Sequence, residues 1–302
     1  MRVGLVAFMA LAFSGCATAA APSHPVPTPA PEASEIPREV PEGVLLFHGD
    51  GTPADFDEIV DAARSAEVVL LGELHDDRVG HRARHALTAR QIDAGDPVTL
   101  SLEMFETDVQ PVVDEYLAGI ITEDHFRAAA RPWVNYEDDY RPYIELARSH
   151  ALPVIAANPP RRYVNAVSRE GPEILDSLSE EALRWLPPLP YPEPSDAYRQ
   201  EWDALMGGHG AHNGERLLLS QALWDAGMAW SIVGALEEGR RVIHVAGAFH
   251  VANGTGIPEA LEHYRPGTEV LTIVGYRVPE SGGFEPEAHA GLGDFVLLTP
   301  RD

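Results

Sequence analysis

Six short apolar runs set the strongest limit on how this chain can fold. They are rich in β-branched residues and are not broken by alternating polar residues, which is typical of parallel strands covered on both faces. Helical patterns separate most of them, so the sequence predicts an α/β fold with a mainly parallel central sheet flanked by helices. The expected strands are Val68–Leu71, Val98–Leu102, Pro153–Ala157, Val242–Ala246, Val270–Val274 and Phe295–Leu298.

The helical patterns have recognisable ends, and the longest of them is followed by Gly239 as a cap. Residues 172–212 interrupt the alternation with the stretch LRWLPPLPYPEPSDAYRQEW. This composition predicts a Pro-rich, partly helical insertion that acts as a lid over a site. The expected helices are Asp55–Ser65, Val79–Ala94, Val109–Leu117, Glu123–Ala130, Tyr140–Ser149 and Asn213–Glu238.

The first 42 residues are expected to lie outside the folded domain. They open with MRVGLVAFMALAFSGC, in which an apolar stretch too short to span a membrane is followed by small residues and Cys16. This pattern predicts a bacterial lipoprotein signal peptide over residues 1–15 and a lipidated Cys16, with a plain secretory signal as the alternative. Residues 16–42 are rich in Pro and Ala and are expected to be a tether, which leaves residues 43–302 as the domain.

The single cysteine and the overall charge indicate the cellular location of the protein and restrict its possible partners. Because Ala17 rather than an aspartate follows Cys16, we expect anchoring to the outer membrane, facing the periplasm. A single cysteine excludes an internal disulfide. The net charge is −25, from 47 acidic and 22 basic residues, which argues against nucleic acid as a partner because such binding needs clustered Lys and Arg.

Polar residues follow several of the expected strands at the point where each ends. Ligands of open α/β sheets bind beyond the carboxyl ends of the strands, and residues two apart in an extended segment point to the same side. Burying several carboxylates together is costly unless a cation compensates, and His and Glu suit Zn²⁺ or Mn²⁺. A metal-dependent hydrolase would use the ion to activate water and one carboxylate as general base. The expected metal-binding and catalytic residues are Glu73, His75, Glu103 and His250.

Other polar residues are expected near the same edge of the sheet. Asn158 either contacts the ligand or caps the next helix, and Arg161 or Arg162 could hold an anionic group bidentately. His209 and His212 lie in a Gly-rich loop, which is typical either of a ligand-contacting loop or of a surface turn.

Helical spacing raises two further possibilities. Gln221 and Asp225 share one face of the long helix, where they either hydrogen-bond to the site residues from behind or form a buried polar network. His81 and His85 are one turn apart, a spacing that can bind a metal ion, but a solvated helix face is the expectation for them. There is no nucleophile elbow, phosphate loop, dinucleotide fingerprint or HExxH motif.

Five segments, taken together and in order, resemble the ChaN family of haem-binding uptake lipoproteins, which belongs to the Tiki/erythromycin-esterase-like superfamily. The resemblance extends from about residue 44 to 300 and implies haem binding, iron uptake and a homodimer. The superfamily's proposed metal-dependent hydrolase centre has a GExH motif, a further Glu and a GxxH motif, which match Gly72–His75, Glu103 and Gly247–His250. The segments are LLGELHDDRVGH, SLEMFETDVQPVVDEYL, AANPPRRYVNAV, LLLSQALWDAGMA and VAGAFHVANGTGIP.

Haem requires an apolar slot, a His or Tyr axial ligand, and cations for its propionates. The insertion offers Tyr191 and Tyr198 beside His209 and His212, and the two arginines Arg161 and Arg162 are suited to the propionates. Three functions therefore stay open: haem binding, metal-dependent hydrolysis, and a non-catalytic scaffold lipoprotein.

Overall fold

The computed structural model describes residues 36–95, 97–206 and 214–301. All of these described residues belong to one compact unit. No helix within the described ranges is both long enough and apolar enough to cross a membrane.

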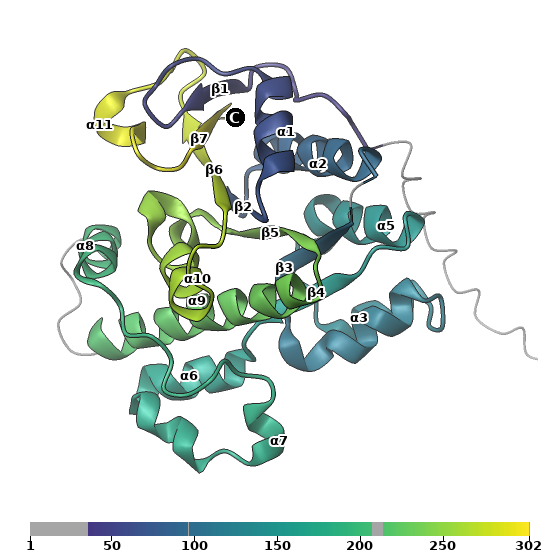
Figure 1. Ribbon diagram of the computed structural model, residues 1–302, viewed down its shortest axis with the longest axis vertical. Coiled ribbons are helices and arrows are strands. Elements are labelled where there is room, and N and C mark those ends of the chain that lie inside the picture. Colours follow the sequence, from purple (N-terminus) through teal and green to yellow (C-terminus); the bar gives the residue numbers. More distant parts are fainter. Residues whose placement is uncertain (1–35, 96, 207–213, 302) are drawn as a thin grey trace, which may run out of the picture. The chain divides into compact units, whose positions relative to one another are not determined.

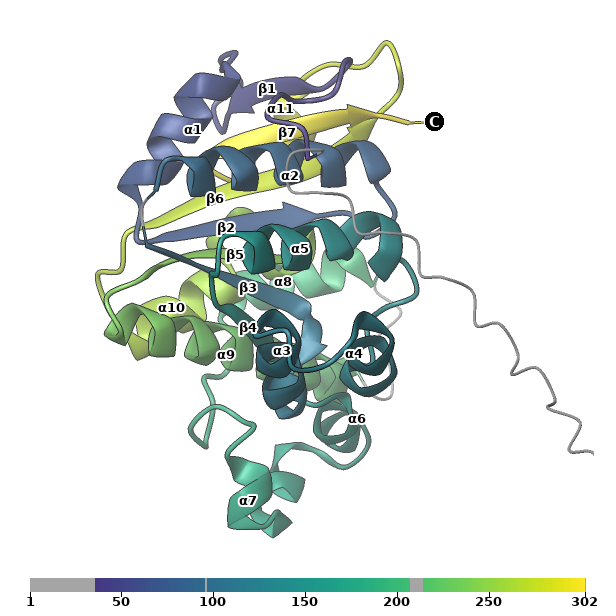
Figure 2. The same cartoon turned by 90° about the vertical axis from the view of Figure 1, so that its right-hand side faces the viewer.

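Within these ranges, seven strands form one sheet in the order β1–β7–β6–β2–β5–β3–β4. β1 pairs antiparallel with β7, whereas all the other neighbouring strands are parallel. Figure 2 shows the strands side by side, with the carboxyl ends of β2 and β3 at the same edge. The strands are β1 (Leu45–His48), β2 (Val68–Glu73), β3 (Val98–Glu106), β4 (Val154–Asn158), β5 (Arg241–Gly247), β6 (Val270–Val278) and β7 (Phe295–Pro300).

Helices cover both faces of the sheet. α2 and α5 lie on one face, and α9 and α10 lie on the other (Figures 1 and 2). Several helices begin at side chains that cap the first turn: Asp55 accepts from the Glu58 N–H at α1, and Ser195 accepts from the Tyr198 N–H at α8. The helices are α1 (Phe56–Ser65), α2 (Arg78–Asp93), α3 (Gln110–Leu117), α4 (Glu123–Ala130), α5 (Arg141–Ser149), α6 (Arg161–Glu170), α7 (Glu180–Leu183), α8 (Asp196–Leu205), α9 (Gly214–Glu237), α10 (Ile257–Tyr264) and α11 (Pro286–His289).

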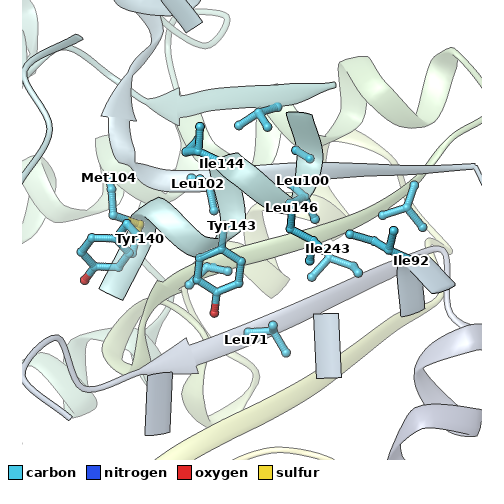
Figure 3. Packing of buried hydrophobic residues seen from close by; sticks show 14 of the residues in the cluster. Leu71, Ile92, Leu100, Leu102, Met104, Tyr140, Tyr143, Ile144, Leu146 and Ile243 are labelled. Carbon is cyan, nitrogen blue, oxygen red and sulfur yellow. The ribbon is translucent and has the colours of Figure 1, made fainter. Parts of the chain in front are cut away.

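The larger core fills the space between the sheet and α2, α3, α4 and α5. Figure 3 shows Leu71 of β2 and Leu100 and Leu102 of β3 in this core, together with side chains of α5. Because α9 and α10 bury the opposite face, every residue of β2 is buried, as the uninterrupted apolar run predicted. The labelled residues of this core are Leu71, Ile92, Leu100, Leu102, Met104, Tyr140, Tyr143, Ile144, Leu146 and Ile243.

The predicted α/β architecture is confirmed, and each of the six expected strands lies within or next to an observed one. The edge strand β1 was not predicted, because its LLFH sequence is only partly buried and lacks the long apolar run of the central strands. The insertion contains α7 and α8 and is therefore partly helical, as expected. In Figure 1 α8 lies beside α9 and α10.

Candidate functional site

β2 ends in a carboxylate, Glu73, whose side chain is completely buried. Its Oε1 accepts hydrogen bonds from the Tyr140 hydroxyl at 2.7 Å and from His75 Nδ1 at 2.9 Å. Its Oε2 lies 3.1 Å from His81 Nδ1. Because His75 donates through Nδ1, the lone pair of its neutral imidazole is on Nε2.

The electrostatics of this group favour an ionised carboxylate. Burial by itself raises the pKa of Glu73, but hydrogen bonds from His75 and His81 and the charge of Arg84 outweigh it and hold the pKa at about 2. Burial lowers the pKa of His75, whereas its bond to Glu73 and the charge of Glu103 raise it, and the net shift is upward.

Glu103, on β3, lies beside the end of β5. Its Oε2 accepts a hydrogen bond of 2.7 Å from the Gly247 N–H. A Cβ on Gly247 would lie 2.9 Å from His75 Nε2 and 3.7 Å from Glu103 Oε2. The absence of a side chain at position 247 therefore leaves room for the His75 ring beside the end of β5.

His250 approaches Glu103 from the other side. Its Nδ1 lies 2.6 Å from Asp225 Oδ1 of α9, and its Nε2 lies 3.8 Å from Glu103 Oε1. Burial lowers the pKa of His250, but the carboxylates of Asp225 and Glu103 raise it to about 9. His250 is therefore an imidazolium at neutral pH, between two carboxylates.

A cavity of about 730 Å³ opens in front of this group, at the carboxyl edge of β2, β3 and β4. His75, Glu103 and Asn158 lie on its strand side, and the loop of residues 131–135 forms the facing side. The Trp133 ring meets the His75 ring edge-on at 4.8 Å between centroids. The apolar part of the lining comes from Met104, Pro132, Trp133, Val134 and Pro159.

Most arginines around this cavity are paired with carboxylates. Arg78 contacts Asp138 at 2.7 Å, and Arg131 contacts Asp108 at 2.5 Å. Arg161 lines the cavity and is exposed, and its side chain makes no hydrogen bond or ion pair within the described residues. It is therefore the cation best placed to meet an anionic ligand.

The expected metal ligands come close to one another but are already engaged. Glu73 is surrounded by His75, His81 and Tyr140, and Glu103 accepts the Gly247 N–H. Within the described residues, no three His, Cys, Asp or Glu side chains are grouped so that they could hold a metal ion. The donor arrangement does not support a divalent metal here.

The family described as "Haem-binding uptake, Tiki superfamily, ChaN" matches residues 59–261, which is more than half of the chain. The chain belongs to this family. The fold is similar to the solved structure of ChaN of Campylobacter jejuni, with 16% identity, 84% of this chain and 96% of that chain covered, and a TM-score of 0.65. The erythromycin esterase EreC is a more distant structural match, with 14% identity, 86% and 83% coverage and a TM-score of 0.43. No curated protein matches the chain.

Not all of the residues predicted for the family's ligand lie at this cavity. Arg162 turns away and contacts Asp108 at 2.5 Å, so it is not free for a propionate. The Tyr191 hydroxyl donates to the Leu219 carbonyl in a different cavity, and the Tyr198 hydroxyl donates to Asp225. His209, His212 and Cys16 lie outside the described residues.

Of the helical residues considered in the sequence, some lie where they were expected and others do not. Asp225 bonds directly to His250, whereas Gln221, one turn earlier, is half-buried and makes no side-chain hydrogen bond within the described part of the chain. The expectation of a solvated face for His81 and His85 is wrong, because the two residues are only 1% and 4% exposed. They are covered by Tyr140 and Tyr143, whose rings meet them edge-on.

Sequence reasoning missed two aromatic residues of the site. Trp133 lies in an irregular loop, and Tyr140 ends a π-helical turn at Tyr136–Tyr140. The Asn135 side chain ties this loop to the strand edge by donating to the His75 carbonyl at 2.9 Å. A π-helical turn is frequent at functional sites, but its presence cannot be read from the sequence.

The raised pKa of His250 predicts a loss of stability in mild alkali. Its ordinary value is 6.5 and its value in the folded protein is about 9, so the folded state holds the proton more tightly than the unfolded state. This contribution is complete below pH 6.5 and disappears as the pH rises through 9. We expect the free energy of unfolding to fall by about 3 kcal/mol over this range. Urea unfolding at several pH values measures it, and a His250→Gln variant should have a flatter profile; equal profiles would contradict the assignment.

Proposed function

We propose that this protein binds haem in the cavity at the carboxyl edge of the sheet, with His75 as the axial ligand. The observation that carries the proposal is the pair of Glu73 and His75. A buried carboxylate holds His75 Nδ1, fixes the ring and leaves Nε2 for a metal, which is the arrangement that metal-ligating histidines commonly have. Haem would supply an iron centre that accepts the imidazole lone pair.

The lining of the cavity fits a porphyrin. Trp133, Met104 and Pro159 offer apolar surface to the macrocycle, and Arg161 offers a cation to a propionate. The volume of about 730 Å³ is in the range of small-molecule and cofactor sites. Membership of the haem-binding uptake family supports the same ligand.

We also propose that the protein works as a homodimer. Val134 lines the cavity and is completely exposed, so a partner that covered the cavity would bury this apolar side chain. The ChaN structure of Campylobacter jejuni is described with cofacial haem binding. A second copy covering this cavity would remove Val134 and the exposed face of a bound porphyrin from water.

Titration of the full chain with haemin, followed by absorbance in the Soret region, tests haem binding. The wild type should saturate with a shifted Soret band. An Arg161→Gln variant should bind about fivefold more weakly, because it loses one partly exposed charge pair. Arg184→Gln is the matched control, since Arg184 is exposed but lies outside this cavity. Absence of saturation in the wild type would refute haem binding, and equal affinities of the two variants would refute the role of Arg161.

We propose that the protein is anchored through a lipid on Cys16 in the outer membrane, facing the periplasm, and takes part in haem or iron uptake. The support is the lipoprotein-like start of the sequence, together with the family. Mass spectrometry of the mature N-terminal peptide tests it. A diacylglyceryl-modified Cys16 at the new N-terminus is expected, and an unmodified terminus formed elsewhere would contradict it.

Acid–base hydrolysis is a second candidate function. It is favoured by Glu103, which lies at the cavity between His75 and the charged His250 and could receive a proton from a bound water. The engaged carboxylates make a metal-independent version the better fit. A panel of esters and amides, tested with wild type and Glu103→Gln, decides it: turnover that the variant loses supports hydrolysis, and no turnover above background by the wild type eliminates it.

A further inference from the structure

A line of buried polar groups connects the insertion with the strand-edge cavity. The Tyr198 hydroxyl of α8 donates to Asp225 Oδ2 at 2.5 Å, and Asp225 Oδ1 lies 2.6 Å from His250 Nδ1. His250 Nε2 then faces Glu103 Oε1 at 3.8 Å, and Glu103 lines the cavity. Each of these four residues is at most 5% exposed.

The surrounding backbone leaves this line little freedom. Gly256 has φ +68°, and a Cβ there would lie 2.7 Å from the His250 carbonyl oxygen and 3.1 Å from Asp225 Oδ1. The backbone therefore closes tightly around the Asp225–His250 pair, at a position where only glycine fits.

α8 contacts this pair in two ways. Besides the bond from Tyr198 to Asp225, the rings of Tyr198 and Trp202 meet Phe249, the residue before His250, at 5.4 and 5.9 Å. Ser195 Oγ, at the start of α8, donates to Glu259 of α10 at 2.6 Å. The described residues of the insertion supply none of the lining of the strand-edge cavity, whereas this line of side chains ends at Glu103, which does line it.

We infer that Tyr198 and Asp225 are positioning residues that hold His250 with Nε2 toward Glu103 and so link the insertion to the ligand cavity. His250 is then a bridge between two carboxylates, Asp225 on α9 and Glu103 on β3. His250 and the Gly247 N–H, which donates to Glu103 Oε2, together hold the Glu103 carboxylate in one position beside the cavity. A movement of α8 that breaks the Tyr198 bond would change the charge distribution beside a bound ligand.

Two other histidines interact electrostatically with His250. Its positive charge lowers the pKa of His244 on β5 and opposes the upward shift in the pKa of His75, just past the end of β2. The Trp224 ring lies 6.3 Å from the His250 ring. The attraction must therefore come from Asp225 and Glu103, and removal of the Asp225 charge leaves only one of the two attractive partners.

Nuclear magnetic resonance of the ¹⁵N-histidine-labelled full chain, without ligand, tests the positioning role. In the wild type, His250 should stay protonated through neutral pH and titrate near pH 9. Asp225→Asn should lower its proton affinity at least tenfold and permit the other tautomer. Tyr198→Phe should give a smaller shift in the same direction.

Tyr191→Phe is the matched control, because it removes one hydroxyl from the same insertion without touching this line. Unchanged His250 titration in both Tyr198→Phe and Asp225→Asn would overturn the inference, as would an equal shift in Tyr191→Phe. If Asp225→Asn does not fold, Tyr198→Phe against Tyr191→Phe decides the matter.

The coupling between the insertion and a bound ligand rests on the proposed haem binding. Haemin titration of Tyr198→Phe, Asp225→Asn and Tyr191→Phe tests this coupling separately from the positioning of His250. Weaker haem binding by Tyr198→Phe, with Tyr191→Phe unchanged, supports the coupling; unaltered affinity overturns it. No haem binding by any protein, with the histidine shifts present, would refute the proposed function and leave the positioning role standing.

Discussion

Replacing Glu73 with Gln should lower the free energy of unfolding by about 3 kcal/mol. The side chain is fully buried, and its carboxylate receives Tyr140 and His75 and lies beside His81. Gln keeps the volume but removes the charge that these groups and Arg84 surround, and breaking a buried ionic network of this kind typically costs about 3–5 kcal/mol. Urea unfolding at pH 7, followed by circular dichroism, measures the difference.

Glu67→Gln is a suitable control because Glu67 lies just before the other end of β2. Its ion pair with Arg265 is at 2.8 Å, but both side chains are more than a third exposed, so its loss should cost less than about 1 kcal/mol.

The pKa of Glu73 in the folded protein is about 2, below its ordinary 4.5. Its stabilisation is therefore present above pH 4.5 and lost as the pH falls toward 2, where the Glu73→Gln difference should shrink. Equal losses of unfolding free energy in Glu73→Gln and Glu67→Gln at pH 7 would contradict the stabilising role of the Glu73 carboxylate.

Replacing His75 with Ala should weaken haem binding on the order of 100-fold, because the iron would lose its axial ligand. Glu73→Gln should weaken it about tenfold, since the ring would remain but would no longer be held in one tautomer by a charged partner. Soret titration gives both affinities. His75 is partly exposed, with 46% of its side chain accessible, so its loss should affect stability less than the loss of Glu73.

His263→Ala is the control for this comparison. His263 lines the separate cavity beneath the insertion, beside Tyr198 and Glu259, and is exposed. If haem binds in the strand-edge cavity, the His263→Ala variant should have the same affinity for haem as the wild type. If His263→Ala weakened binding and His75→Ala did not, the ligand would belong to the cavity beneath the insertion.

The central sheet could be predicted because β2, β3 and β5 are buried along nearly their whole length and are therefore mainly apolar. β2 shows this, since its pairing with β5 and β6 leaves no exposed residue. The same reasoning placed Glu73, His75 and Glu103 at one edge, because parallel strands deliver their carboxyl ends together. β1 could not be recognised, because a short edge strand with one partner needs no such pattern.

The limits of sequence reasoning are clearest for His81 and Tyr198. A polar face on a helix indicates solvent in most proteins, but on α2 that face is covered by the π-helical turn and α5, so His81 contacts Glu73 instead. Tyr198 was expected to contact a ligand, but its hydroxyl donates a hydrogen bond to Asp225, 27 residues away in the sequence. Both outcomes depend on packing between distant segments, which a single sequence does not specify.

A crystal structure of the protein with haem bound tests the proposed site most directly. We predict haem in the strand-edge cavity, with iron ligated by His75 Nε2, the macrocycle against Trp133, and a propionate at Arg161. Iron ligated by any other side chain, or haem held in another cavity, would contradict the central claim.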